Sequence, residues 1–518
     1  MKDTSMEHKG RYALIGSDVD LHPAKHLHSL IADYEFDLIS VKNESELRLV
    51  LSDCKYQGFM VAAPYRTASM AYVDRVSDYA KRAGAVNIIR RTNDGKLEGY
   101  NTDIRSFEFL VPRIVKGWKA VILGTGCGAV AAAEALKELD AGEIVLASRN
   151  PEAARAKLGN RFEIVSFNEL RLHKDAKILV NATPVGMVPG AYESPLDGKM
   201  ISAKSFKKLE LAIDLIYNPS RTKFLQDLER CSGTDNKMVF QRLSANITER
   251  IHGKRHTDFH NTIRDNIYGK SRVFTKSGID MLIRQALFAK SIWIGEESQA
   301  HDDEIVIDLK RQLLEEQLNV ILIGMPGSGK SSIARMIAKE LGRPFVDVDR
   351  IIEEKMGARI ADVLVDPDKG EAYMRSFETE ALKEVCCMTG CVIATGGGAV
   401  LRPINRDLIR ENSCVVYIRR PLNLLSLKNR PLSQAEGVEK LYKERVGLYR
   451  KIADVTITNS HTFGESFDKN GTKNSYTYDL KRFAYKVIKQ VRYQLDDVID
   501  DYWTQYERAE RKRSKESR

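Results

Sequence analysis

Two patterns of apolar and polar positions alternate along most of the chain. Short apolar runs such as Val320–Ile323 are followed by longer segments, such as Ser332–Leu341, in which apolar residues recur every three to four positions. The first pattern is typical of a buried strand, and the second of a helix that covers one face of a sheet. This alternation predicts an α/β protein built from mainly parallel sheets.

A glycine-rich segment at 324–331 lies between one such strand and helix. Its glycines allow backbone N–H groups to turn toward an anion, Lys330 can reach the outer phosphates of a nucleotide, and the Ser331 hydroxyl can ligate Mg²⁺. We therefore expect ATP and Mg²⁺ to bind here. The predicted nucleotide-binding residues are Gly327, Ser328, Gly329, Lys330, Ser331 and Ser332.

A second glycine turn, 124–129, follows the apolar run 118–123 and precedes a helical pattern and the strand-like run 143–147. Its Gly-x-Gly-x-x-Ala order in a βαβ unit predicts a dinucleotide site. Arg149 follows the second strand, where NAD sites place an acidic residue, and a guanidinium suits the 2′-phosphate of NADP. The predicted NADP-binding residues are Gly124, Thr125, Gly126, Cys127, Gly128, Ser148, Arg149, Asn150 and Arg155.

Asp347 and Asp349 follow the first of these nucleotide loops. Their alternation with valines predicts two carboxylates on one side of a strand end, where they can serve a metal and a hydroxyl group.

Composition narrows the classes of partner. The formal net charge is +10, but the basic residues are spread along the chain, so small anionic ligands explain the charge without nucleic acid. Seven cysteines are too sparse for a disulfide framework, and we expect Cys386, Cys387 and Cys391 to be ordinary thiols. Without an apolar membrane-spanning segment or signal core, we expect a cytoplasmic protein with no membrane partner. The sequence does not indicate an oligomeric state.

Residues from about 11 to 317 resemble shikimate dehydrogenases. The resemblance rests on the motifs at 84–87, 101–103, 181–187, 214–219 and 278–285. It implies that Asn87, Asp103, Tyr217 and Gln285 hold the ring hydroxyls of the substrate or act in catalysis. It also implies that Gly278 lies near the nicotinamide.

This part of the chain departs from the family pattern at several positions. Arg66 stands where the family has a proton-exchanging Lys beside Asp103, and a guanidinium is a poor proton exchanger. His22 and Ala24 replace two carboxylate-binding serines, and Ala62 replaces a Thr. An insertion at 233–272 carries His252, His256 and His260, which we interpret as part of a polar loop and not as metal ligands. Two hypotheses follow: a diverged 3-dehydroshikimate reductase, or a module that binds a ligand without turning it over.

The remainder, to about residue 495, resembles shikimate kinases. The resemblance rests on the motifs at 373–378, 394–400, 430–432 and 444–449. It implies that Asp347 and Ser331 bind Mg²⁺, that Asp349, Arg375, Gly397 and Arg445 hold shikimate, and that Lys330 and Arg430 stabilise the transferred phosphoryl group. The lid before Arg430 is shorter than usual in the family.

The resemblances define the expected domains. These are a substrate-binding domain at 1–105, an NADP-binding domain at 106–277 with the 233–272 insertion, returning helices at 278–317, a kinase domain at 318–498 and a charged tail at 499–518. The leading hypothesis is a fused shikimate-pathway enzyme that acts on shikimate and 3-dehydroshikimate. Another hypothesis is an NTPase whose ATP hydrolysis drives a partner protein.

Overall fold

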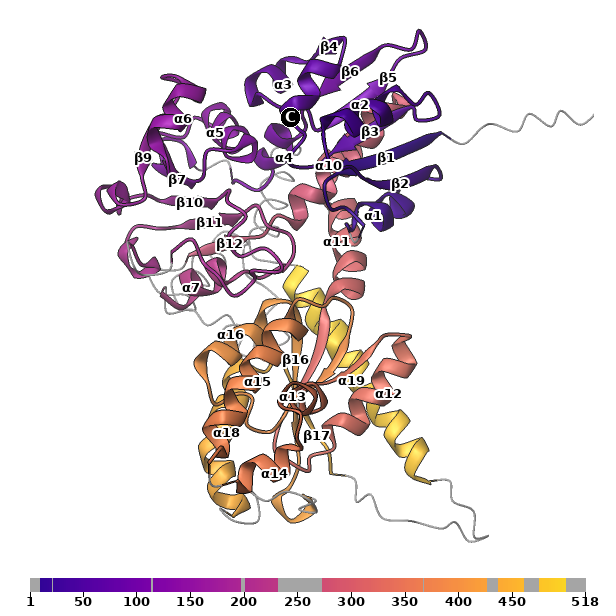
Figure 1. Ribbon diagram of the computed structural model, residues 1–518, viewed down its shortest axis with the longest axis vertical. Helices are drawn as coiled ribbons and strands as arrows, with labels where there is room; N and C mark the ends of the chain where they lie inside the picture. Colours follow the sequence, from indigo (N-terminus) through magenta and orange to yellow (C-terminus); the bar gives the residue numbers. More distant parts are fainter. Residues whose placement is uncertain are drawn as a thin grey trace, which may run out of the picture.

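The computed structural model describes residues 10–20, 22–112, 115–196, 201–231, 273–366, 368–425, 437–460 and 475–499. Three sheets form three units, with two units side by side above the third (Figure 1). The predicted α/β class is confirmed. The 233–272 insertion with His252, His256 and His260, the residue Arg430 and the 499–518 tail, apart from the helical backbone at residue 499, lie outside the described residues.

The first sheet has the strand order β2-β1-β3-β5-β6-β4 and mixes parallel with antiparallel pairs. Its strands are β1 (Arg11–Gly16), β2 (Glu35–Ser40), β3 (Gly58–Val61), β4 (Arg75–Val76), β5 (Ile88–Arg91) and β6 (Leu97–Tyr100). Its helices are α1 (Ala24–Ile31), α2 (Glu44–Ser52), η1 (Ala68–Tyr72), α3 (Asp78–Ala83) and α4 (Asp103–Glu108). Every residue of β3 is buried, as expected of a strand covered on both faces.

The second sheet is parallel throughout, with the order β12-β11-β10-β7-β8-β9. Its strands are β7 (Ala120–Leu123), β8 (Ile144–Ser148), β9 (Glu163–Ser166), β10 (Ile178–Asn181), β11 (Leu211–Asp214) and β12 (Phe274–Lys276). Its helices are α5 (Cys127–Glu138), α6 (Pro151–Leu158), η3 (Glu169–Leu172), η4 (Ala203–Ser205) and α7 (Lys223–Cys231). Strands β8 and β10 lie on opposite sides of β7, so the strand order reverses at β7. Such a switch point opens a binding crevice beyond the carboxyl ends of the strands.

The third sheet is also parallel, with the order β14-β15-β13-β16-β17. Its strands are β13 (Asn319–Ile323), β14 (Phe345–Asp347), β15 (Val392–Ala394), β16 (Ser413–Arg419) and β17 (Val455–Thr458). Its helices are α12 (Lys330–Leu341), α13 (Val348–Met356), α14 (Ile360–Val365), α15 (Gly370–Cys386), α16 (Pro403–Glu411), η6 (Leu422–Leu424) and α18 (Val438–Ile452).

The structure corrects one local prediction in this unit. Strand β14 ends at Asp347, and Asp349 lies in the first turn of α13 instead of on a strand. The valine–aspartate alternation is typical of a strand, but Val348 and Ile352 are both buried on one face of a helix. The helical spacing therefore decides the local structure.

Two long helices lead from the first unit to the third, and another long helix packs beside the second of them. Helix α10 (Ile279–Ile294) returns to the first unit, and after η5 (Gln299–His301) helix α11 (Asp303–Gln317) leads down to β13 (Figure 1). Helix α19 (Ser475–Ile499) packs against α11 and α12. Its Phe483, Val487 and Val491, spaced three to four residues apart, are buried in that contact. Among the described helices, none combines the length and apolar character needed to cross a membrane.

Candidate active sites

The nucleotide loop of the third unit leaves the central strand β13 and enters α12. Gly324, Gly327 and Gly329 all have positive φ, at 145°, 81° and 92°, which side-chain-bearing residues rarely adopt. The Lys330 ammonium donates to the carbonyls of Gly324 and Met325 at 2.9 and 3.1 Å, so it lies folded over the loop. The buried Ser328 Oγ has no hydrogen-bond partner among the described residues. A phosphate group would offer acceptors to these donors.

Carboxylates and glycines of neighbouring strands meet at the same edge. Asp347 ends β14, and the glycines at 396–398 follow β15, which lies between β14 and β13. A Cβ atom added to Gly396 would lie 2.6 Å from Asp349 Oδ1, and one added to Gly397 would lie 2.5 Å from a ring carbon of Pro326. The glycines therefore let the main chain pass directly between the nucleotide loop and Asp349.

Arg375 of α15 is a buried cation beside the glycine loop at this edge. It is 7% exposed, and its Nη1 donates to Glu378 Oε1 at 2.8 Å while Nη2 donates to Glu371 Oε1 at 2.6 Å. Burial raises the pKa of Glu378, although the ion pair with Arg375 opposes that rise. The guanidinium lies directly against the glycine loop, because a Cβ on Gly398 would be 2.0 Å from Nη2.

Arg445 on α18 is a second buried cation in this unit, with 3% exposure. Its Nε has no hydrogen-bond acceptor among the described residues and lies 3.6 Å from the Glu444 carboxylate. Tyr449, one turn later, donates its hydroxyl hydrogen to the Gly397 carbonyl. A buried guanidinium with an unsatisfied donor suits an anionic ligand.

The N-terminal half places a buried carboxylate at the centre of its own polar cluster. Asp103 is fully buried, and its Oδ1 accepts from Asn87 at 2.7 Å and from Gln285 at 2.8 Å. Its Oδ2 accepts from Arg66 Nη1 at 2.9 Å. Arg66 after β3, Asn87 just before β5, Asp103 at the start of α4 and Gln285 of α10 thus converge.

Arg66 is held by more than this ion pair. Its Nε donates to the Val61 carbonyl at 3.0 Å, which fixes the guanidinium plane. Burial acts to lower the pKa of Arg66, but the neighbouring Asp103 and Cys127 outweigh it and raise that pKa. The guanidinium therefore stays charged, and it links the carboxylate cluster of the first unit to Cys127 at the start of α5.

His22 and Tyr217 lie near Arg66, with their ring centroids 5.4 Å apart. Burial, assisted by Arg66, lowers the pKa of His22 to about 4, and burial raises the pKa of Tyr217 to about 12. The Ala24 N–H donates to His22 Nδ1 at 3.1 Å, so the neutral ring carries its proton on Nε2. Both side chains are thus neutral hydrogen-bond donors near pH 7.

The dinucleotide turn lies at the switch point of the second sheet. Gly124 has a φ of 117°, and α5 begins at Cys127 with Gly126 as its N-cap. A Cβ on Gly278 would lie 2.2 Å from the Leu215 carbonyl oxygen, so only glycine permits α10 to begin against β11. Ser148 ends β8, Arg149 is exposed, and Asn150 caps α6. Arg155 instead donates to the Ile164 carbonyl at 2.5 Å.

Sequence reasoning assigned no role to several residues that complete these sites. Glu378 and Glu371 hold Arg375, and their spacing of three and four residues from it on one helix was a detectable signal. Asn459, which follows β17, donates its side-chain N–H to the Ser328 carbonyl at 3.0 Å. This contact joins distant parts of the chain, and no local sequence pattern indicates it.

Comparisons with known proteins match both halves of the chain. The model for shikimate kinase matches residues 326–471, and the model for the shikimate dehydrogenase substrate binding domain matches residues 22–89. A shikimate kinase of Clostridium botulinum is 40% identical over 152 residues, which are 28% of this chain and 90% of that protein. A shikimate kinase of Burkholderia lata is 43% identical over 148 residues, 27% of this chain and 79% of that protein.

One solved structure that resembles the chain is shikimate dehydrogenase 1 from Peptoclostridium difficile, at 26% identity and a TM-score of 0.45. The match covers 59% of this chain and 97% of that chain. A chorismate mutase/shikimate 5-dehydrogenase fusion protein from Clostridium acetobutylicum has 26% identity, 58% and 96% coverage and a TM-score of 0.46. Residues 22–89 thus match the model for the shikimate dehydrogenase substrate binding domain, and from the kinase model and the kinase relatives together, the chain belongs to the shikimate kinase family.

Proposed function

We propose that the C-terminal unit transfers the γ-phosphoryl group of ATP to the 3-hydroxyl of shikimate. The observation that carries this proposal is the meeting of the nucleotide loop, Asp349 and the buried Arg375 at one sheet edge. Arg375 and Arg445 would bind the shikimate carboxylate, and Gly397 would allow the ring close to the main chain.

Phosphoryl transfer depends mainly on positioning and charge neutralisation. Asp349 would accept a hydrogen bond from the 3-hydroxyl and take its proton as the oxygen attacks phosphorus. Lys330 and Arg430 would stabilise the charge on the transferred group. Ser331 and Asp347 would hold Mg²⁺, which when bound neutralises charge on the phosphate oxygens.

ADP release with and without shikimate tests this assignment in the full-length protein. We expect release to depend on shikimate, and Asp349→Asn to lower kcat by about 10²- to 10⁴-fold because the proton acceptor is lost. Asp362→Asn removes an exposed carboxylate and serves as the control. Rapid ATP hydrolysis without shikimate would favour an NTPase that drives a partner protein.

For the N-terminal half we propose an NADP-dependent unit for 3-dehydroshikimate and shikimate. Gly124–Gly128 and the start of α5 would bind the pyrophosphate, and Arg149 the 2′-phosphate. When bound, NADPH supplies the hydride. Asn87, Asp103, Tyr217 and Gln285 would orient the ring, while Gly278 permits the approach of α10.

One observation favours binding without turnover as a second candidate for this half. Arg66 occupies the position from which a proton is exchanged, and it is fixed between Asp103 and the Val61 carbonyl. NADP reduction by shikimate, followed by absorbance in wild type and Arg66→Lys, distinguishes the two. Turnover by the wild type supports the reductase, whereas turnover only in Arg66→Lys supports a binding module.

A further inference from the structure

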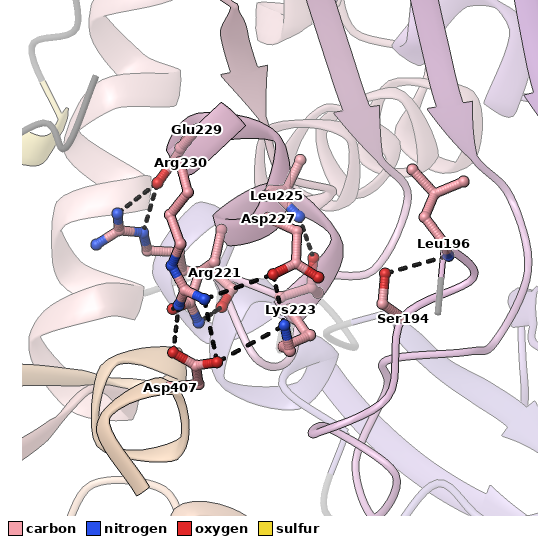
Figure 2. Close-up of polar contacts among 11 residues, drawn as sticks. Ser194, Leu196, Arg221, Lys223, Leu225, Asp227, Glu229, Arg230 and Asp407 are labelled. Atoms are coloured by element: carbon pink, nitrogen blue, oxygen red, sulfur yellow. Dashed lines mark hydrogen bonds and ion pairs between the residues drawn. The ribbon is translucent and has the colours of Figure 1, made fainter. Parts of the chain in front are cut away.

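A cluster of charged side chains joins α7 of the second unit to α16 of the kinase unit (Figure 2). Arg230 pairs with both carboxylate oxygens of Asp407, with Nη1 3.1 Å from Oδ2, and Lys223 Nζ lies 3.6 Å from Oδ2. The Asp407 side chain is only 15% exposed. Because water screens this carboxylate little, its pairing with two cations holds the helices together more strongly than an exposed pair would.

Other contacts extend the same interface. The Arg221 N–H donates to the Glu411 carbonyl at 3.2 Å, at the end of α16. At the end of α15, the thiol of the C-cap residue Cys387 donates to the Pro189 carbonyl at 3.5 Å, and Lys383 Nζ of α15 lies 4.9 Å from the centre of the Tyr192 ring. The second unit therefore contacts α15, which precedes the glycine loop of the kinase unit, and α16, which follows it.

Helix α16 carries this interface toward the acceptor side of the kinase. Asn405 lies two residues before Asp407 and therefore points to a different side of the helix. It is fully buried, its Oδ1 accepts from Thr379 Oγ1 at 2.9 Å, and its Nδ2 donates to Glu378 Oε2 at 3.4 Å. Glu378 in turn binds Arg375, so polar contacts and one short helix connect Arg230 with Arg375.

We propose that Asn405 is a positioning residue for Arg375, and that the Arg230–Asp407 contact allows the N-terminal half to set this position. Asn405 holds Glu378 and Thr379 on α15, and the interface holds α16. Loosening the interface would let α16 shift and would leave Arg375 less well aligned for a carboxylate. The inference rests on the proposed kinase function, in which Arg375 binds the carboxylate of shikimate.

Steady-state kinetics of the full-length protein provide the first test. We expect Arg230→Ala and Asp407→Ala each to raise the KM for shikimate about three- to tenfold, with kcat and the KM for ATP within about twofold of wild type. The double variant should have no higher KM for shikimate than either single variant. Arg230→Lys keeps a positive charge near Asp407, so its KM should rise less than that of Arg230→Ala. Arg75→Ala, which removes an exposed arginine of the first unit, is the matched control.

Hydrogen–deuterium exchange provides a readout that does not require activity. In Arg230→Ala we expect faster exchange in 403–411 and in 370–386, and in Asn405→Ser faster exchange in 370–386, compared with Arg75→Ala. If wild type shows no shikimate-dependent ADP release, the proposed function is wrong and the exchange data still decide the coupling. Unchanged exchange in 370–386, together with an unchanged KM for shikimate, would overturn the inference.

Discussion

Glu411 offers a sharp test of the interface, because its carboxyl group is buried without a hydrogen-bond partner among the described residues. It is 1% exposed, and burial raises its pKa to about 9. The titratable groups that face it are Asp407 on α16, Lys223, Asp227 and Arg230 on α7, and Cys386 and Cys387 at the end of α15. The cations do not compensate for the loss of water, so the folded protein retains the proton.

The sign of the pH effect follows from this shift. An unfolded glutamate loses its proton near pH 4.3, whereas folded Glu411 keeps it up to about pH 9. Between these values the folded state binds one proton more, so stability falls by about 1.4 kcal/mol per pH unit as pH rises. Glu411→Gln keeps the side-chain size and removes the titration. Relative to wild type, the variant should therefore gain about 2.7 kcal/mol between pH 6 and pH 8.

Urea unfolding of wild type and Glu411→Gln at pH 6, 7 and 8 measures this gain. Comparison at each pH cancels the titration of all other groups and isolates Glu411. Glu354→Gln, at an exposed ion pair on α13, is the control and should show no such trend. A stability difference that stays the same at all three pH values would refute a buried, protonated Glu411.

Three further predictions concern the two sites. Arg375→Lys should raise the KM for shikimate about tenfold or more, because an ammonium cannot replace the bidentate guanidinium. ADP-release kinetics measure this KM, and an unchanged value would contradict the prediction. Gly398→Ala should act similarly by displacing the Arg375 guanidinium, while Gly447→Ala, which faces open space on α18, should not. Arg66→Met should destabilise the first unit by about 2 kcal/mol in urea unfolding, since buried Asp103 loses its charged partner and Arg66 is itself partly exposed. An equal effect of Arg75→Met would argue against that explanation.

Much of the fold could be predicted from the sequence because strand, loop and helix patterns are local. The loop at 324–331 and the turn at 124–128 require glycine for backbone reasons that the residues themselves reveal. The position of Asp349 was predicted less well, since a Val-Asp repeat satisfies both strand and helix spacing until burial of Ile352 decides between them.

Contacts between distant segments set the limit of sequence reasoning. No local sequence pattern indicates the ion pair of Arg230 with Asp407 or the hydrogen bond from Asn459 to the Ser328 carbonyl. The roles predicted for individual site residues, and the domain boundaries, stay predictions for the experiments above.

The apolar core around α11 bears on how such a fused chain can be divided or recombined. Leu313 and Leu314 of α11 belong to one cluster with Leu287 of α10, Ile333 of α12 and Val487 of α19. A cut at residue 318 would therefore split a hydrophobic core and leave apolar side chains of both halves in water. For an exchange of kinase domains between related chains, a breakpoint before Asp303 would keep α11 with α12 and α19, and would separate α11 from the part of the core that precedes it, such as Leu287 of α10.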